Sequence, residues 1–149
     1  MKTTDFSNLN PSGQELLKAA ATAMEEAYNP YSHFYVGAAL RTEGKIILGA
    51  NVENSAYGSS ICAERSAIVS ANAQGLKSAS QIAIIIKSDK GPVNEPSAPC
   101  GACRQMLYEL SQVSGVDIEI IMSNTDMSKI IISTINELLP LAFGPKDLI

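Results

Sequence analysis

The stretch PSAPCGACRQML, residues 96–107, contains two of the three cysteines of the chain, Cys100 and Cys103. The third, Cys62, lies well upstream in SSICAERSAI, residues 59–68. A C-x-x-C pair by itself is compatible with a redox couple, with half of a zinc site or with two small apolar residues. The interpretation of the pair therefore depends on where Cys62 lies relative to it.

Both cysteine-bearing segments are predicted to begin helices. CAERSAIVSANAQG (62–75) and CGACRQMLYELSQ (100–112) have helical patterns with a cysteine in the first turn. Helix N-termini carry unpaired N–H groups and a partial positive charge, which favours thiolate over thiol. Two such helix starts that face one another would present Cys62, Cys100 and Cys103 to one metal ion.

The remaining patterns predict alternating helices and strands. Apolar residues of the segment 11–28 recur at steps of three and four, which predicts an amphipathic helix. The apolar run 81–88 is typical of a strand covered on both faces. The other expected elements are strands 36–40, 45–52, 116–122 and 128–133 and a short helix over 135–139. This order predicts a single α/β domain over residues 1–149, with a mixed sheet because the first two strands form a hairpin.

The composition argues against several classes of partner. Hydrophobic residues make up 46% of the chain and charged residues 17%, which is typical of a globular domain. An apolar run of about 18 residues is absent, and the N-terminal MKTTDFSNLN lacks the apolar core of a signal peptide, so we expect a cytoplasmic protein that does not enter a membrane. The net charge of -4 and the lack of a dense Lys/Arg block argue against nucleic acid and favour a small, uncharged substrate.

Three cysteines and a single histidine, His33, limit the possible metal sites. A closed structural zinc site needs four protein ligands, whereas a catalytic site has three and an open position. His33 lies in a Pro-Tyr-Ser loop without a partner at ligand spacing, so we interpret it as an ordinary loop histidine. Glu64 follows Cys62 closely and suits acid–base chemistry beside a metal, but an acidic residue in a first turn also simply suits the helix dipole.

CAERSA (62–67) together with PCGACRQ (99–105) resembles the zinc-dependent cytidine deaminases, specifically their small homotetrameric branch. The resemblance extends to three further segments, NPYSHFYVGAAL (29–40), GANVENSAYGSSICAE (49–64) and ELLPLAFGPKDL (137–148). It covers residues 12–148 in order and at similar separations, and is therefore far more specific than a lone C-x-x-C. It implies a three-layer α-β-α fold with a mixed, mostly parallel five-stranded sheet between layers of helices.

The resemblance also implies the chemistry. Cys62, Cys100 and Cys103 would bind one Zn²⁺ per chain, with water in the fourth position. The implied activity is hydrolytic deamination of cytidine and deoxycytidine to uridine and deoxyuridine, with release of ammonia. Glu64 would move protons between the water, ring N3 and the departing ammonia, and Arg65 would hydrogen-bond to the ligand sulfurs.

Substrate contacts are implied in the same way. The resemblance implies that Asn51 and Glu53 bind the ribose 3′-hydroxyl, and since alternate residues of a strand share one face, both can reach the same ligand. Phe34 would stack on the pyrimidine ring, which is compatible with ordinary core packing as well. The backbone around Ala63 and Pro99 would bind the edge of the base.

Some implied contacts cross a subunit boundary. Tyr57, Ser55 and Phe143 match positions that reach an adjacent site in the family's homotetramer, so the resemblance implies shared active sites. The implied biological role is pyrimidine salvage from free nucleosides. For Arg104, a structural role and an ordinary surface position both remain possible.

Alternatives remain at this point. A blasticidin S-type deaminase shares C-A-E and P-C-x-x-C-R-Q but is disfavoured by NVEN and FGP in this chain. A non-catalytic zinc domain would leave Glu64 without a role, and a C-x-x-C redox protein would leave Cys62 without one. Tyr35 and the long segment 88–99 depart from the family pattern beside the pocket, which leaves the exact nucleoside open.

Overall fold

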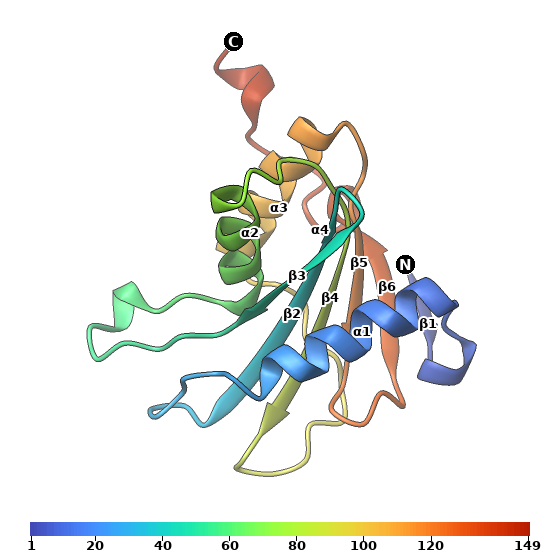
Figure 1. The fold of residues 1–149 in the computed structure, drawn as a ribbon, viewed down its shortest axis with the longest axis vertical. Coiled ribbons are helices and arrows are strands. Elements are labelled where there is room, and N and C mark those ends of the chain that lie inside the picture. Colours follow the sequence, from blue (N-terminus) through green and yellow to red (C-terminus); the bar gives the residue numbers. More distant parts are fainter.

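A six-stranded sheet lies between helices in the computed structural model, which describes residues 1–149 (Figure 1). The strands are β1 (Lys2–Thr4), β2 (Phe34–Thr42), β3 (Lys45–Ala50), β4 (Ala79–Ser88), β5 (Glu119–Ser123) and β6 (Ile130–Thr134). The α-helices are α1 (Pro11–Met24), α2 (Ala63–Ala73), α3 (Gly101–Ser114) and α4 (Ile135–Leu138). The strand order across the sheet is β1-β6-β5-β4-β2-β3.

The expected α/β class is confirmed, but the mostly parallel five-stranded sheet is wrong in two details. β1 adds a sixth strand, which pairs antiparallel with β6 and is too short to show a periodicity in the sequence. β4 and β5 form the single parallel pair, and all other neighbours run antiparallel. The crossover through α3 permits the parallel pair, whereas the short β2–β3 and β5–β6 turns require antiparallel neighbours.

The central strand β4 accounts for the three layers. Its five consecutive residues Ile82–Ile86 are buried, as expected for a strand covered on both faces. On one face, Ile85 packs in a cluster with Leu16 and Leu17 of α1. On the other face, Ile84 packs in a cluster with Leu107 of α3 and with apolar residues of α2. The helices therefore lie on opposite sides of the sheet (Figure 1).

Helix ends follow local signals. α1 begins after Asn10, whose side chain accepts a hydrogen bond from the backbone N–H of Gly13 at 2.7 Å. It ends at Met24, four residues earlier than expected, and the chain then turns so that Tyr28 bridges to Val52.

None of the helices has both the length and the apolar character needed to cross a bilayer.

Two glycines let the helices approach the sheet closely. A Cβ on Gly37 would collide with the carbonyl oxygen of Ala20 in α1. A Cβ on Gly49 would collide with the carbonyl oxygen of Ala63, the first residue of α2. Gly49 therefore sets how near the cysteine-bearing start of α2 lies to the sheet.

Candidate active site

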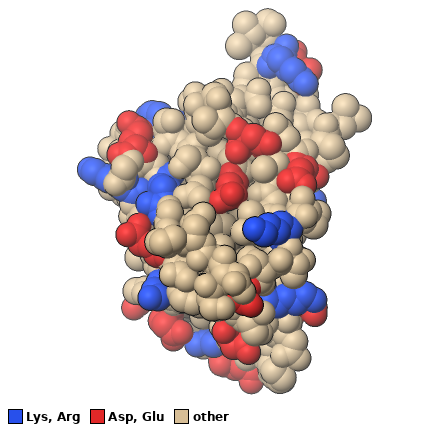
Figure 2. All heavy atoms as spheres, turned by 90° about the vertical axis from the view of Figure 1, so that its right-hand side faces the viewer, with Lys and Arg blue, Asp and Glu red and all other residues tan.

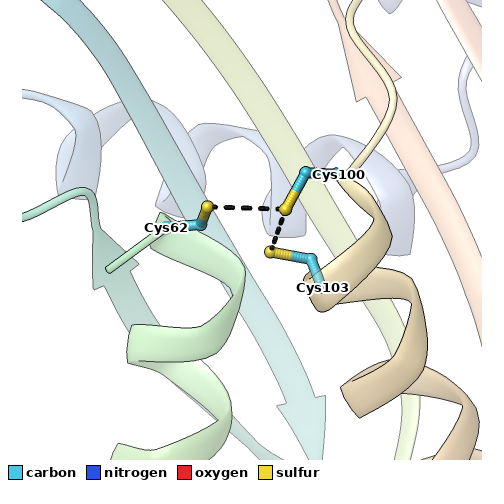
Figure 3. Close-up of side chains that lie close together, drawn as sticks. All are labelled: Cys62, Cys100 and Cys103. Carbon is cyan, nitrogen blue, oxygen red and sulfur yellow. Dashed lines mark hydrogen bonds between the residues drawn. The ribbon is translucent and has the colours of Figure 1, made fainter. Parts of the chain in front are cut away.

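Three sulfur atoms converge where α2 and α3 begin (Figure 3). Cys62 is the N-cap of α2, Cys100 is the N-cap of α3, and Cys103 lies one turn into α3. The Sγ atoms of Cys62 and Cys100 are 3.7 Å apart, and those of Cys100 and Cys103 are 3.5 Å apart. All three lie within 4.8 Å of one another. The fold thus brings together the three cysteines that the sequence singled out.

The sulfur geometry fits a zinc ion. A Zn–S bond of about 2.3 Å in a tetrahedral site places neighbouring sulfurs about 3.8 Å apart, close to the two shortest separations here. This cluster is the only group of His, Cys, Asp and Glu side chains in the chain with the spacing of a metal site. His33 lies outside it, in a loop where its backbone N–H donates to the Asn29 carbonyl. Three protein donors leave a fourth position for solvent or substrate.

Glu64 lies in the first turn of α2, beside the sulfurs. Its side chain is buried, at 4% exposure, yet it lines the same cavity as Cys62 and Cys100. Burial raises the pKa of the Glu64 carboxyl, and the nearby charge of Cys62 raises it further. A carboxyl whose pKa moves toward neutrality can both accept and return a proton near pH 7.

A cavity of about 340 Å³ ends on the sulfurs and Glu64. It is lined by Ser32, Phe34, Val36, Asn51, Glu53, Ser60, Ile61, Cys62, Glu64, Ile84, Ile86, Ser97, Ala98 and Cys100. Its only carboxyl side chains are Glu53 and Glu64, and it contains no Lys, Arg or His. A cavity of this size and mostly apolar lining suits a small molecule with few polar groups.

The predicted contact residues Asn51 and Phe34 are linked through the backbone. Asn51 Oδ1 accepts from the N–H of Val36 at 2.8 Å, and its Nδ2 donates to the carbonyl of Phe34 at 2.9 Å. The Asn51 amide therefore holds the start of β2 and with it the Phe34 ring that lines the cavity. The sequence gives no signal for this bridge, because it joins the residue that follows β3 to backbone groups at the start of β2.

Comparisons with known proteins identify the family of the chain. The profile described as "Cytidine and deoxycytidylate deaminase zinc-binding region" matches residues 11–118. The chain belongs to this family. A cytidine deaminase of Halalkalibacterium halodurans is 41% identical over 138 residues, covering 91% of this chain and 96% of that protein. A probable cytidine deaminase of Dictyostelium discoideum is 42% identical and covers 91% and 86%. The crystal structure of cytidine deaminase from Burkholderia pseudomallei superposes with a TM-score of 0.76 at 38% identity, covering 91% of this chain and 100% of that one.

Zinc binding, which the family description names, resolves an electrostatic conflict in this deaminase. Hydrogen bonding from Cys103, assisted by Arg65 and Cys100, lowers the pKa of Cys62 to about 5. The same contact with Cys62, together with burial, raises the pKa of Cys103. Once Cys62 is a thiolate, its charge disfavours ionisation of the neighbouring cysteine thiols. A bound cation would offset this repulsion. Arg65 Nη2 lies 3.9 Å from Cys62 Sγ and 3.3 Å from the Ser60 carbonyl oxygen, as a positive group beside the sulfurs.

Other residues singled out from the sequence occupy varied positions. Ala63, the first residue of α2, is fully buried, and Pro99 is buried with its carbonyl accepting from Arg104 Nε at 2.8 Å. Tyr57 is 76% exposed and Phe143 is 58% exposed, and neither lines the cavity within one chain. Ser55 is exposed as well. The roles predicted for Tyr57, Ser55 and Phe143 therefore stay predictions that involve a neighbouring subunit.

Several cavity residues were missed from the sequence. Ser32, Ser60, Ile61, Ser97 and Ala98 line it, and all lie within or beside the motif segments. Their proximity to the motifs was the available signal, but small and polar residues in loops carry no chemistry that distinguishes them from turn residues.

Glu53 holds the loop before β2. Its Oε1 accepts from the backbone N–H groups of Tyr31 and Ser32, at 3.0 and 3.1 Å. Hydrogen bonds from Ser32, followed by that from Tyr31, hold the pKa of the Glu53 carboxyl below its ordinary value of 4.5.

We expect the contribution of Glu53 to the stability of the folded protein to be independent of pH near neutrality. Because its folded-state pKa is lowered, the stabilisation is present above the unfolded pKa and is lost only as pH falls through the lower folded value. Melting temperatures of the wild type and of Glu53→Ala should differ by a constant amount from about pH 8 to pH 5, and the difference should shrink only as the pH falls below the ordinary carboxyl pKa of 4.5 toward the lowered folded value. A difference that disappears already between pH 7 and 6 would contradict this assignment.

Proposed function

We propose that this chain catalyses the hydrolytic deamination of cytidine and deoxycytidine to uridine and deoxyuridine, with release of ammonia. The observation that carries the proposal is a cavity of nucleoside size that ends on three converging sulfurs with a buried carboxyl beside them. Relatives about 40% identical over most of the chain are cytidine deaminases, which supports the same activity here.

The proposed mechanism assigns one task to the metal. When bound to Cys62, Cys100 and Cys103, zinc supplies Lewis-acid activation of a water for attack at neutral pH. Glu64 accepts a proton from the attacking water and delivers a proton to N3 of the ring. As the bond from C4 to the exocyclic amine breaks, Glu64 accepts the proton of the new C4 hydroxyl and delivers it to the amine, which leaves as ammonia while the C4 carbonyl forms. Its burial excludes competing water from these transfers.

The other cavity residues would orient the substrate. Phe34 stacks on the pyrimidine, and the backbone near Ala63 and Pro99 reads the edge of the base. Glu53 accepts a hydrogen bond from the ribose 3′-hydroxyl, and Asn51 contributes at the same hydroxyl while holding the start of β2. Arg65 remains beside Cys62 and tunes the sulfurs.

The charges of the cavity favour a free nucleoside over a nucleotide. A 5′-phosphate would enter a site that contains the carboxylates Glu53 and Glu64 and no basic side chain. Nucleic acid is disfavoured by the same reasoning and by the net charge of -4. On the face seen in Figure 2, basic and acidic side chains are interspersed, without a continuous basic tract.

We further propose a cytoplasmic homotetramer that acts in pyrimidine salvage. Tyr57 and Phe143 are large, exposed aromatic side chains that do not reach the cavity of their own chain, as expected for residues that complete a neighbour's site. Three free thiols that must stay reduced to bind metal suit a reducing compartment.

The activity can be tested directly with purified, zinc-loaded protein. We expect cytidine and deoxycytidine to lose ultraviolet absorbance and release ammonia. The kcat/KM for deoxycytidylate should be lower than that for deoxycytidine by about 100-fold, because the cavity carboxylates repel its 5′-phosphate. Removing the metal with a chelator should abolish turnover, and adding zinc back should restore it. Zinc-loaded protein that turns over blasticidin S but neither nucleoside would support the alternative substrate, and inactivity on all of them would reject the proposal.

A further inference from the structure

Arg104 makes two hydrogen bonds that join distant parts of the chain. It follows Cys103 directly on α3, and its side chain is half-buried. Its Nε donates to the carbonyl of Pro99 at 2.8 Å, and its Nη1 donates to the carbonyl of Leu138 at 2.9 Å. The planar guanidinium can serve both carbonyls at once because its donors point in fixed, different directions.

The first of these bonds acts on the wall of the cavity. Ser97, Ala98 and Cys100 line the cavity, and Pro99 lies between them with its ring buried. No helix or strand is present from the end of β4 to the start of α3. Within residues 96–99 the bond from Arg104 is the only hydrogen bond. The orientation of this wall therefore depends on Arg104.

The second bond acts on the C-terminal segment, residues 138–149. Leu138 is the last residue of α4, and the chain beyond it runs along α3 before extending away from the body of the fold (Figure 1). Gln105 Nε2 donates to the carbonyl of Phe143 at 2.9 Å, and Gly144 packs directly against the ring of Tyr108. The Gln105 side chain thus hydrogen-bonds only to this segment, whereas that of Arg104 hydrogen-bonds to both the segment and the cavity wall.

We infer that Arg104 is a positioning residue that fixes the cavity wall at residues 97–100 and ties it to the end of α4. Through Pro99 it orients the peptide groups that face the substrate and the backbone that carries Cys100. The expected effect on KM for cytidine rests on the proposed function, whereas the expected effect on the rate of zinc release does not.

The test compares Arg104→Ala with the matched control Gln105→Ala. We expect Arg104→Ala to raise KM for cytidine about 10-fold with a smaller change in kcat, because a loosened wall weakens ground-state and transition-state binding alike. Release of zinc to a coloured chelator should become about 10-fold faster, because the segment that leads into Cys100 is no longer held at the Pro99 carbonyl. Gln105→Ala should stay within about 2-fold of the wild type in both measurements.

The outcomes separate the inference from its alternatives. Equal effects of Arg104→Ala and Gln105→Ala on KM and on zinc release would overturn it, since Arg104 would then only anchor the C-terminal segment. If Arg104→Ala does not fold, Arg104→Lys replaces it. The lysine can reach one carbonyl, so an intermediate change in zinc release supports the inference and a change no larger than that of Gln105→Ala overturns it. If the wild type does not deaminate cytidine, the proposed function fails, while zinc release still decides the role of Arg104.

Discussion

Glu64→Gln is expected to lower kcat for cytidine by about 1,000-fold while leaving the zinc content unchanged. The amide has nearly the shape of the carboxyl and fits the same buried position, but it cannot accept and return a proton. Because the side chain does not belong to the sulfur cluster, metal binding should not depend on it. Steady-state kinetics together with metal analysis of the same preparation would measure both quantities.

A matched control is available on α3. Glu109 is exposed and lies outside the cavity, so Glu109→Gln should change neither kcat nor zinc content. Full activity of Glu64→Gln would show that another group transfers the protons. Loss of zinc together with activity would assign Glu64 a structural role at the start of α2 instead.

Gly49→Ala is expected to have the largest effect on folding and to remove zinc as well. The new Cβ would collide with the carbonyl oxygen of Ala63 and the backbone nitrogen of Ala67, so α2 must move away from β3. Neither obstacle is a flexible side chain that could move aside. Overpacking of this kind costs about 3 kcal/mol. The shift also displaces Cys62, the N-cap of α2, from the two sulfurs on α3.

The effect can be followed by denaturant unfolding and by zinc content. Gly58→Ala is the matched control, because a Cβ there would meet nothing within 4 Å and the backbone has no left-handed conformation. It should unfold at the same denaturant concentration as the wild type. A Gly49→Ala protein with unchanged stability and full zinc content would show that α2 can shift without disturbing the metal site.

The sequence alone determined the class of fold and the cysteine cluster. The apolar run 81–88 predicted the doubly covered central strand, and the strand is buried there as expected. The patterns around Cys62 and Cys100 predicted two helix starts, and both cysteines are N-caps. These features are readable because the side-chain period and the capping residues depend on neighbours within a few positions.

Only the tertiary structure decided the direction of the strands, the distances between the sulfurs and the tasks of Asn51 and Arg104. The mostly antiparallel arrangement arises from which strands become neighbours, and β1 forms only because β6 is there to pair with it. The amide of Asn51 binds the carbonyl of Phe34, 17 residues earlier, and the guanidinium of Arg104 binds the carbonyl of Leu138, 34 residues later. A backbone carbonyl is present in every residue, so no local pattern marks the one that will be bound, and its partner is set by how the packed layers bring the segments together.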